Sequence, residues 1–116
     1  MMRVTIYHNP RCSTSRRTLQ LLRDTGVEPE IVEYLRQPPD AALLKNLLNM
    51  LGVSPRDLLR RGEAAYKQLG LADPGKSDDE LIAAIVENPI LLERPIVVKG
   101  AKAALGRPPE NVLEIL

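Results

Sequence analysis

The sequence has one cysteine, one histidine and three tyrosines, and it contains no phenylalanine or tryptophan. A single cysteine excludes an internal disulfide framework and also a cysteine-rich metal site. Because aromatic side chains are scarce, the core has to be built from aliphatic residues. No stretch of the chain approaches the roughly 18 consecutive apolar residues that a membrane-spanning helix requires.

The charges of the chain nearly cancel. Sixteen basic and fifteen acidic residues give a net charge of +1, which offers no general attraction to nucleic acid or to an anionic membrane. With 44% hydrophobic residues in 116, the chain is expected to form one compact domain over residues 1–116. The first residues do not resemble a secretory signal, and a free thiol persists best in a reducing compartment. We therefore expect a cytoplasmic protein.

The first third of the chain is predicted to form a strand, a helix and a second strand. The strands are residues 3–8 and 30–34, which are short and rich in β-branched and aromatic residues. The helix between them begins around Ser13 or Thr14, either of which can cap it, and it stops at Gly26.

The middle of the chain, residues 40–88, is predicted to be a helical insertion. Asp40 caps a leucine-rich helix, and Ser54 opens a short helix that reaches Gly62. Ser77 begins a capping-box pattern for another helix.

The tail returns to strands at residues 95–98 and 103–106, which can pair as a hairpin, and it closes with a last helical segment. The order is β-α-β, a helical insertion and then β-β-α. This predicts the α/β class with a small mixed sheet, in the arrangement of the thioredoxin-like fold.

Cys12 lies in a polar segment between the first strand and the first helix. Free backbone N–H groups and the positive end of the helix dipole are expected to face its sulfur. Arg11, Arg16 and Arg17 are expected to add positive charge, and His8 to add more. All of these favour the thiolate, which is the reactive form. We therefore predict a lowered pKa and a nucleophilic role for Cys12, rather than the role of a small buried hydrophobe that a lone cysteine often has.

Ser15 occupies the position at which a thioredoxin-type C-x-x-C motif carries its second cysteine. A serine at this position can donate a hydrogen bond to the Cys12 thiolate, but it cannot form a disulfide. Any adduct or disulfide formed at Cys12 therefore has to be cleared by an outside thiol.

Three segments carry a resemblance to a known family: residues 7–16 (YHNPRCSTSR), 88–98 (NPILLERPIVV) and 106–114 (GRPPENVLE). In this order they resemble the glutaredoxin-coupled arsenate reductases, and shorter similar segments lie at 58–60 and 69–71. The likeness covers essentially the whole chain and is nearest to a shorter branch of the family. It implies a thioredoxin-like fold with a helical insertion.

Carried over residue by residue, the resemblance makes Cys12 the nucleophile that attacks arsenate, with His8 and Ser15 beside it. It implies that Pro95 follows a cis peptide bond. It assigns the oxyanion to three arginines: Arg60, Arg94 and Arg107. Arg56 and Arg61 lie close to Arg60 in the sequence and could take its place.

The resemblance also implies the reductants. Glutathione would attack the arsenic adduct as a co-substrate, arsenite would leave, and glutaredoxin would reduce the remaining mixed disulfide. No bound cofactor or metal is expected. Two alternatives stay open: a glutathione-dependent oxidoreductase for another substrate, and a redox-responsive regulator that binds RNA polymerase. The regulators of this fold usually carry a paired cysteine at the start of the first helix, which this sequence lacks.

Overall fold

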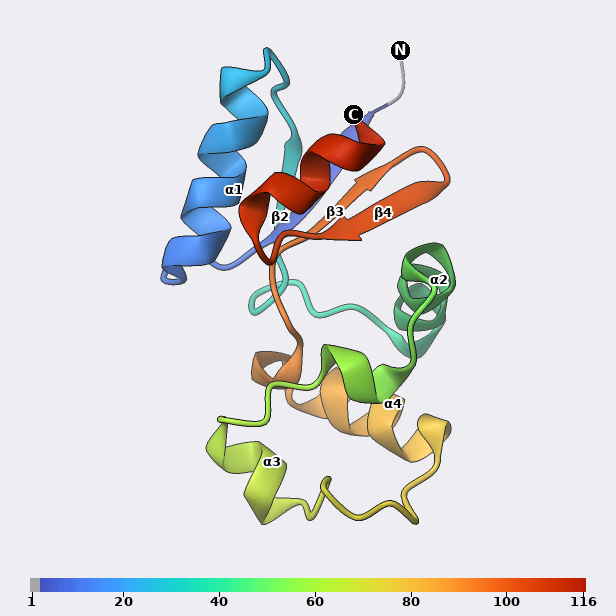
Figure 1. Ribbon diagram of the computed structural model, residues 1–116. Coiled ribbons are helices and arrows are strands. Elements are labelled where there is room, and N and C mark those ends of the chain that lie inside the picture. Colours follow the sequence, from blue (N-terminus) through green and yellow to red (C-terminus); the bar gives the residue numbers. More distant parts are fainter. Residues whose placement is uncertain (1–2) are drawn as a thin grey trace. The chain divides into compact units, whose positions relative to one another are not determined.

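The computed structural model describes residues 3–116. The chain divides into two compact units, which Figure 1 shows as ribbons. The first unit is formed by the residues up to Gln37 together with Arg94–Leu116, and the second by Pro38–Glu93.

A four-stranded mixed sheet forms the frame of the first unit. Its strands are β1 (Val4–His8), β2 (Glu30–Glu33), β3 (Ile96–Lys99) and β4 (Lys102–Leu105). They lie in the order β2-β1-β3-β4, in which β1 and β2 are parallel and the other pairs are antiparallel. A parallel pair needs a crossover connection, and α1 (Ser13–Asp24) supplies it. The end of β1 therefore leads through residues 9–12 into the first turn of α1.

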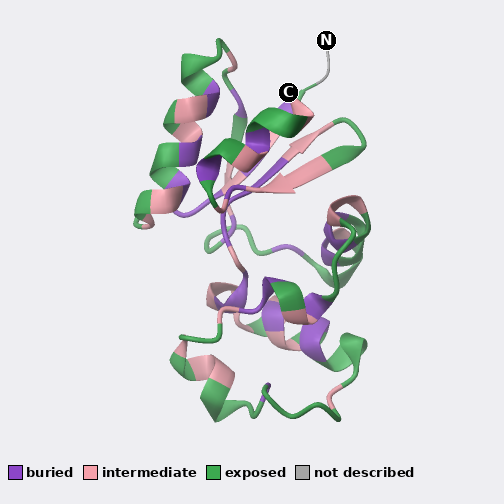
Figure 2. Cartoon of the chain, in the orientation of Figure 1, coloured by how far each residue is buried: buried purple, intermediate pink, exposed green. Residues whose placement is uncertain are grey.

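The core of the first unit is aliphatic, as the scarcity of aromatic residues predicts. Ile6 and Val97 pair across β1 and β3, and both are fully buried. Leu22 of α1 and Val112 of the 3-10 helix η3 (Pro109–Ile115) pack against them. Figure 2 shows these segments with their buried positions in purple. The predicted α/β class with a small mixed sheet is confirmed, and the order β-α-β followed by β-β-α is thioredoxin-like.

The second unit is helical and encloses the span predicted as an insertion. It contains α2 (Ala41–Leu51), η1 (Pro55–Leu58), α3 (Ala64–Gln68), α4 (Asp78–Glu87) and η2 (Pro89–Leu91). Asp40 caps α2 by accepting from the Leu43 N–H at 2.8 Å, and Ser77 forms the predicted capping box of α4. The expected helix from Ser54 to Gly62 was too long. It ends at Leu58, because Leu59 turns extended and pairs with Leu92.

Gly106 is the glycine whose missing side chain matters most for packing. A Cβ at this position would lie 2.8 Å from Pro95 Cγ and 2.8 Å from Thr18 Oγ1. Thr18 is fully buried in α1. Gly106→Ala is therefore expected to lower the free energy of unfolding by about 1–3 kcal/mol, because an extra methyl group in a packed interior forces its neighbours to move. Chemical denaturation measures this change.

Gly62→Ala is the matched control for that experiment. A Cβ at Gly62 meets no atom within 4 Å. Its substitution is expected to change the free energy of unfolding by no more than about 0.5 kcal/mol. Equal losses in the two variants would show that the contacts around Gly106 do not set the effect.

Candidate active site

Cys12 is the N-cap residue of α1. The preceding turn is closed by the Cys12 N–H, which donates to the Asn9 carbonyl at 3.0 Å. This turn brings the chain to the helix one residue earlier than expected, so the prediction that Ser13 or Thr14 caps the helix was wrong. At an N-cap the side chain faces the backbone N–H groups of the first turn. The sulfur of Cys12 takes the place that a serine or threonine oxygen usually holds.

The surroundings of Cys12 favour its thiolate. Partial burial raises the pKa of the thiol. The backbone N–H groups of Ser15 and Thr14 and the side chain of Arg94 lower it by more than burial raises it. The net effect is a pKa below the ordinary value of a cysteine. The predicted direction is confirmed.

The positive charge beside the sulfur comes from the far end of the sequence. Arg94 is buried, with 8% of its surface exposed, and its side chain interacts with Cys12. Arg107 Nη2 lies 3.8 Å from Cys12 Sγ, and Arg107 Nε donates to the Arg94 carbonyl at 2.8 Å. Arg11, Arg16 and Arg17, which were expected to supply this charge, are exposed. The peptide bonds before Pro95 and Pro108 are both cis, the first as predicted.

The guanidinium of Arg94 has donors for which residues 3–116 supply no acceptor. Its Nε and Nη1 atoms are buried and have no hydrogen-bond partner within residues 3–116. Burial lowers the pKa of Arg94, but Cys12 and Tyr34 raise it by more than burial lowers it. The guanidinium therefore stays a cation. A buried donor without a partner costs about 1–3 kcal/mol, and more when it is charged. An oxyanion is the kind of ligand that offsets this cost, because arginine donors match its geometry.

His8 and Ser15 form a buried pair behind the cysteine turn. His8 Nδ1 lies 2.6 Å from Ser15 Oγ, which also accepts from the Asn9 N–H at 3.1 Å. The Ser15 hydroxyl thus faces His8, and Ser15 acts on Cys12 through its backbone N–H instead of the predicted hydroxyl. Helical side chains tilt toward the N-terminus of their helix, so the Ser15 hydroxyl points back toward His8 at the end of β1 and not toward the Cys12 sulfur.

The pKa of His8 is lowered, which favours its neutral form. Burial lowers its pKa most; Arg16 and Arg23 add to the lowering, and Glu33 opposes it. The expectation that His8 adds positive charge beside Cys12 was therefore wrong. With Ser15 Oγ accepting from Asn9, the serine proton can go to His8 Nδ1, which leaves the ring proton on Nε2.

Arg60 belongs to the second unit, whereas the other predicted site residues belong to the first. Its Nη1 lies 3.0 Å from Glu93 Oε1 and its Nε 3.2 Å from Glu63 Oε1. Arg56 does not offer a free guanidinium in its place, because its Nη atoms donate to the carbonyls of Leu71 and Asp73. The role of Arg60 in binding an oxyanion stays a prediction.

Tyr34 and Asn9 were missed as parts of the site. Tyr34 is fully buried, and its hydroxyl interacts with the Arg94 side chain. Asn9 is buried, and its Oδ1 accepts from the Arg11 N–H at 2.9 Å, which fixes the cysteine turn. The Asn9-Pro10 pair was visible as a turn signal. The sequence signal for Tyr34 was an aromatic residue at the end of a predicted strand.

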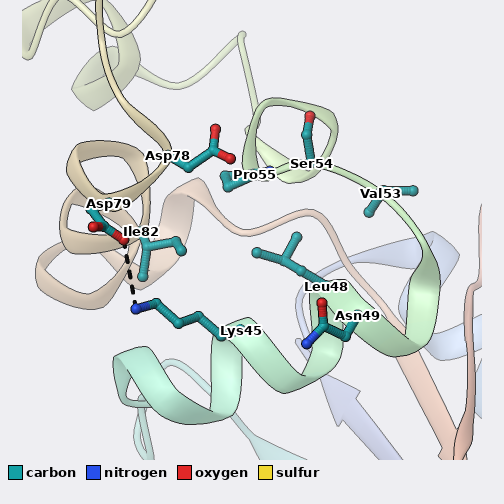
Figure 3. A pocket seen from close by; sticks show the side chains of 9 residues that line it. All are labelled: Lys45, Leu48, Asn49, Val53, Ser54, Pro55, Asp78, Asp79 and Ile82. Carbon is teal, nitrogen blue, oxygen red and sulfur yellow. Dashed lines mark ion pairs between the residues drawn. The ribbon is translucent and has the colours of Figure 1, made fainter.

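A hollow of about 480 Å³ lies in the second unit, between α2, η1 and α4 (Figure 3). Lys45 Nζ pairs with Asp79 Oδ1 at 3.6 Å beside it. None of the sequence-predicted site residues lines this hollow. Among the described residues, no cluster of three or more histidine, cysteine, aspartate or glutamate side chains could hold a metal ion, and no helix is long and apolar enough to cross a membrane.

Comparison with known proteins adds independent findings. A model of the ArsC family matches residues 7–115. An arsenate reductase of Neisseria meningitidis serogroup B is 48% identical over 117 aligned positions, which cover all of both chains. The uncharacterized protein YfgD of Escherichia coli is 60% identical, over 97% of this chain and 96% of its own. The structure of an arsenate reductase from Vibrio cholerae is 51% identical and covers 99% of this chain and 98% of its own, with a TM-score of 0.97.

Proposed function

Because the chain belongs to the ArsC family, we propose that it reduces arsenate to arsenite in the cytoplasm, with the Cys12 thiolate as nucleophile. The observation that carries this proposal is a lowered cysteine pKa beside the buried donors of Arg94, which have no hydrogen-bond partner in the described part of the chain. Arsenate is a tetrahedral dianion near neutral pH, and a thiolate is also negative. Arg94 and Arg107 offset the repulsion that would otherwise keep the two apart.

In the first step, the Cys12 thiolate attacks arsenic. A sulfur–arsenic bond forms, and one arsenate oxygen takes up protons and leaves as water. The Nε and Nη1 donors of Arg94 hold the remaining oxygens, and the Arg107 guanidinium lies beside the sulfur. These donors are in place before the reaction, so they stabilise the charge of the adduct without further rearrangement.

In the second step, a thiol from outside the protein attacks the adduct, because Cys12 is the sole cysteine. The thiolate of glutathione forms a disulfide with Cys12 as the sulfur–arsenic bond breaks. The electron pair of that bond leaves with arsenic, which is reduced from As(V) to As(III) and departs as arsenite. A glutaredoxin thiol then attacks the glutathione sulfur and releases the Cys12 thiolate. The chain itself needs no bound cofactor in this scheme.

An assay that couples oxidised glutathione to NADPH oxidation by glutathione reductase tests the proposal. With arsenate, glutathione and glutaredoxin present, we expect NADPH oxidation that stops when any one of the three is left out. Failure of the complete mixture to oxidise NADPH in an arsenate-dependent manner would overturn arsenate as the substrate. Full turnover without glutaredoxin, or with thioredoxin and its NADPH-dependent reductase in place of glutathione, glutaredoxin and glutathione reductase, would overturn the proposed reductants.

A further inference from the structure

We propose that a hollow behind the cysteine turn binds the charged ends of glutathione. The hollow measures about 200 Å³ and lies between the turn after β1 and the segment that follows β2. Its lining includes His8, Arg11, Glu33, Leu35 and Arg36, all in the first unit. This inference rests on the proposed function, which requires glutathione to reach Cys12, and it names the residues that receive it.

The charges around the hollow match those of the tripeptide. Arg11, Glu33 and Arg36 line it, and none of the three forms an ion pair with another residue of the described chain. The Arg36 N–H donates to the Glu33 carbonyl at 2.9 Å, which keeps these two residues on one turn. Glutathione carries two carboxylates and one ammonium group. Two guanidinium groups and one carboxylate are the complementary set.

His8 and Leu35 add a donor and an apolar contact. His8 is buried, with 5% of its surface exposed, and its Nδ1 is taken by Ser15. Ser15 engages Nδ1 and not Nε2, so Nε2 can donate to a carboxylate or peptide carbonyl in the hollow. Leu35 is a large hydrophobic residue left 39% exposed, which a bound peptide would cover.

The lining of the hollow adjoins the reacting cysteine in the sequence. Arg11 immediately precedes Cys12, and consecutive Cα atoms are about 3.8 Å apart. Glutathione carries its thiol on the middle one of its three residues, so a molecule whose carboxylates bind Arg11 and Arg36 has its thiol near the cysteine turn, where Cys12 follows Arg11. A volume of about 200 Å³ is below the roughly 300–1,000 Å³ of pockets that enclose a ligand. Loose binding of this kind suits a co-substrate that has to leave as part of a disulfide.

S-methylglutathione tests the site without chemistry, because its sulfur is blocked. Titration of the parent protein, followed by backbone NMR, is expected to shift the signals of residues 8–11 and 33–36. In an Arg11→Gln/Arg36→Gln variant we expect the dissociation constant to rise about tenfold or more, because charge-assisted hydrogen bonds are lost. An Arg17→Gln/Lys102→Gln variant removes the same charge from exposed positions outside the hollow, and we expect it to bind as the parent does.

Steady-state kinetics give the second readout. The Arg11→Gln/Arg36→Gln variant is expected to raise the KM for glutathione while leaving the KM for arsenate within about twofold, because the hollow does not include Arg94 or Arg107. Equal weakening in both double variants, or shifts confined to other residues, would overturn the site. If the parent binds S-methylglutathione at residues 8–11 and 33–36 but does not reduce arsenate, the proposed function fails and the site stands. If the parent reduces arsenate but shows no such binding, the site fails and the proposed function stands.

Discussion

Replacing Cys12 with serine is expected to abolish arsenate-dependent turnover, with a loss of about 10⁴-fold or more, as is usual when an enzyme loses its nucleophile. A serine hydroxyl stays protonated where the Cys12 thiol ionises, and it cannot form the disulfide that the second step requires. Because the chain has no other cysteine, no neighbouring thiol can take over. The coupled NADPH assay, run at saturating glutathione and glutaredoxin, measures the loss.

Ser13→Ala is the control for that experiment. Ser13 is the exposed first residue of α1, next to Cys12 in the sequence. Its substitution is expected to leave turnover within about twofold, as for a surface change outside the reacting groups. Both variants should keep the unfolding midpoint of the parent. A Cys12→Ser protein with more than a hundredth of the parent rate would exclude Cys12 as the nucleophile.

Arg94→Ala is expected to lower turnover by about 10²–10³-fold, which is the usual effect of removing a preorganised donor from an anionic transition state. The substitution removes the two buried donors Nε and Nη1 and one positive charge beside the Cys12 sulfur. It should also raise the pKa of Cys12, because the Arg94 side chain is one of the groups that lower it. The Cys12 pKa and the turnover of the same preparation should therefore change together.

Two further variants show what Arg94 contributes. Arg94→Lys keeps the charge but loses the forked donors, so it should recover part of the lowered Cys12 pKa and little of the turnover. Arg16→Ala removes an exposed arginine that the sequence pattern favours as a source of charge, and it should leave both quantities near the parent values. If Arg16→Ala lost as much activity as Arg94→Ala, general positive charge would explain the site better than specific donors.

Local signals in the sequence predicted most of the fold. Asp40 and Ser77 begin α2 and α4 as expected, and Gly26 and Gly52 adopt the positive φ angles typical of helix ends. The short helix α3 was missed, because its five residues include no buried position that would give a periodic apolar pattern. Boundaries set by tertiary contacts were also missed, such as the extended Leu59 that pairs with Leu92.

The site was predictable only in part. The place of Cys12 before a helix is a local property, and so is the lowered pKa that follows from backbone N–H groups. The approach of Arg94 and Arg107 depends on pairing between β1 and β3, which are far apart in the sequence. No local pattern reveals that pairing, and these arginines were identified by resemblance alone. The direction of the Ser15 hydroxyl depends on its contact with His8, which sequence spacing does not specify.

The ionisation of Cys12 is the property on which the whole account depends, and the pH dependence of its alkylation by iodoacetamide measures it most directly. Because the chain has one cysteine, the rate reports a single thiol. Deprotonation raises the rate, so a lowered pKa moves the midpoint of the profile to lower pH. We expect a midpoint clearly below about 8.5, the value of a free cysteine, and a shift upward in Arg94→Ala. A parent midpoint at or above that value would contradict the account.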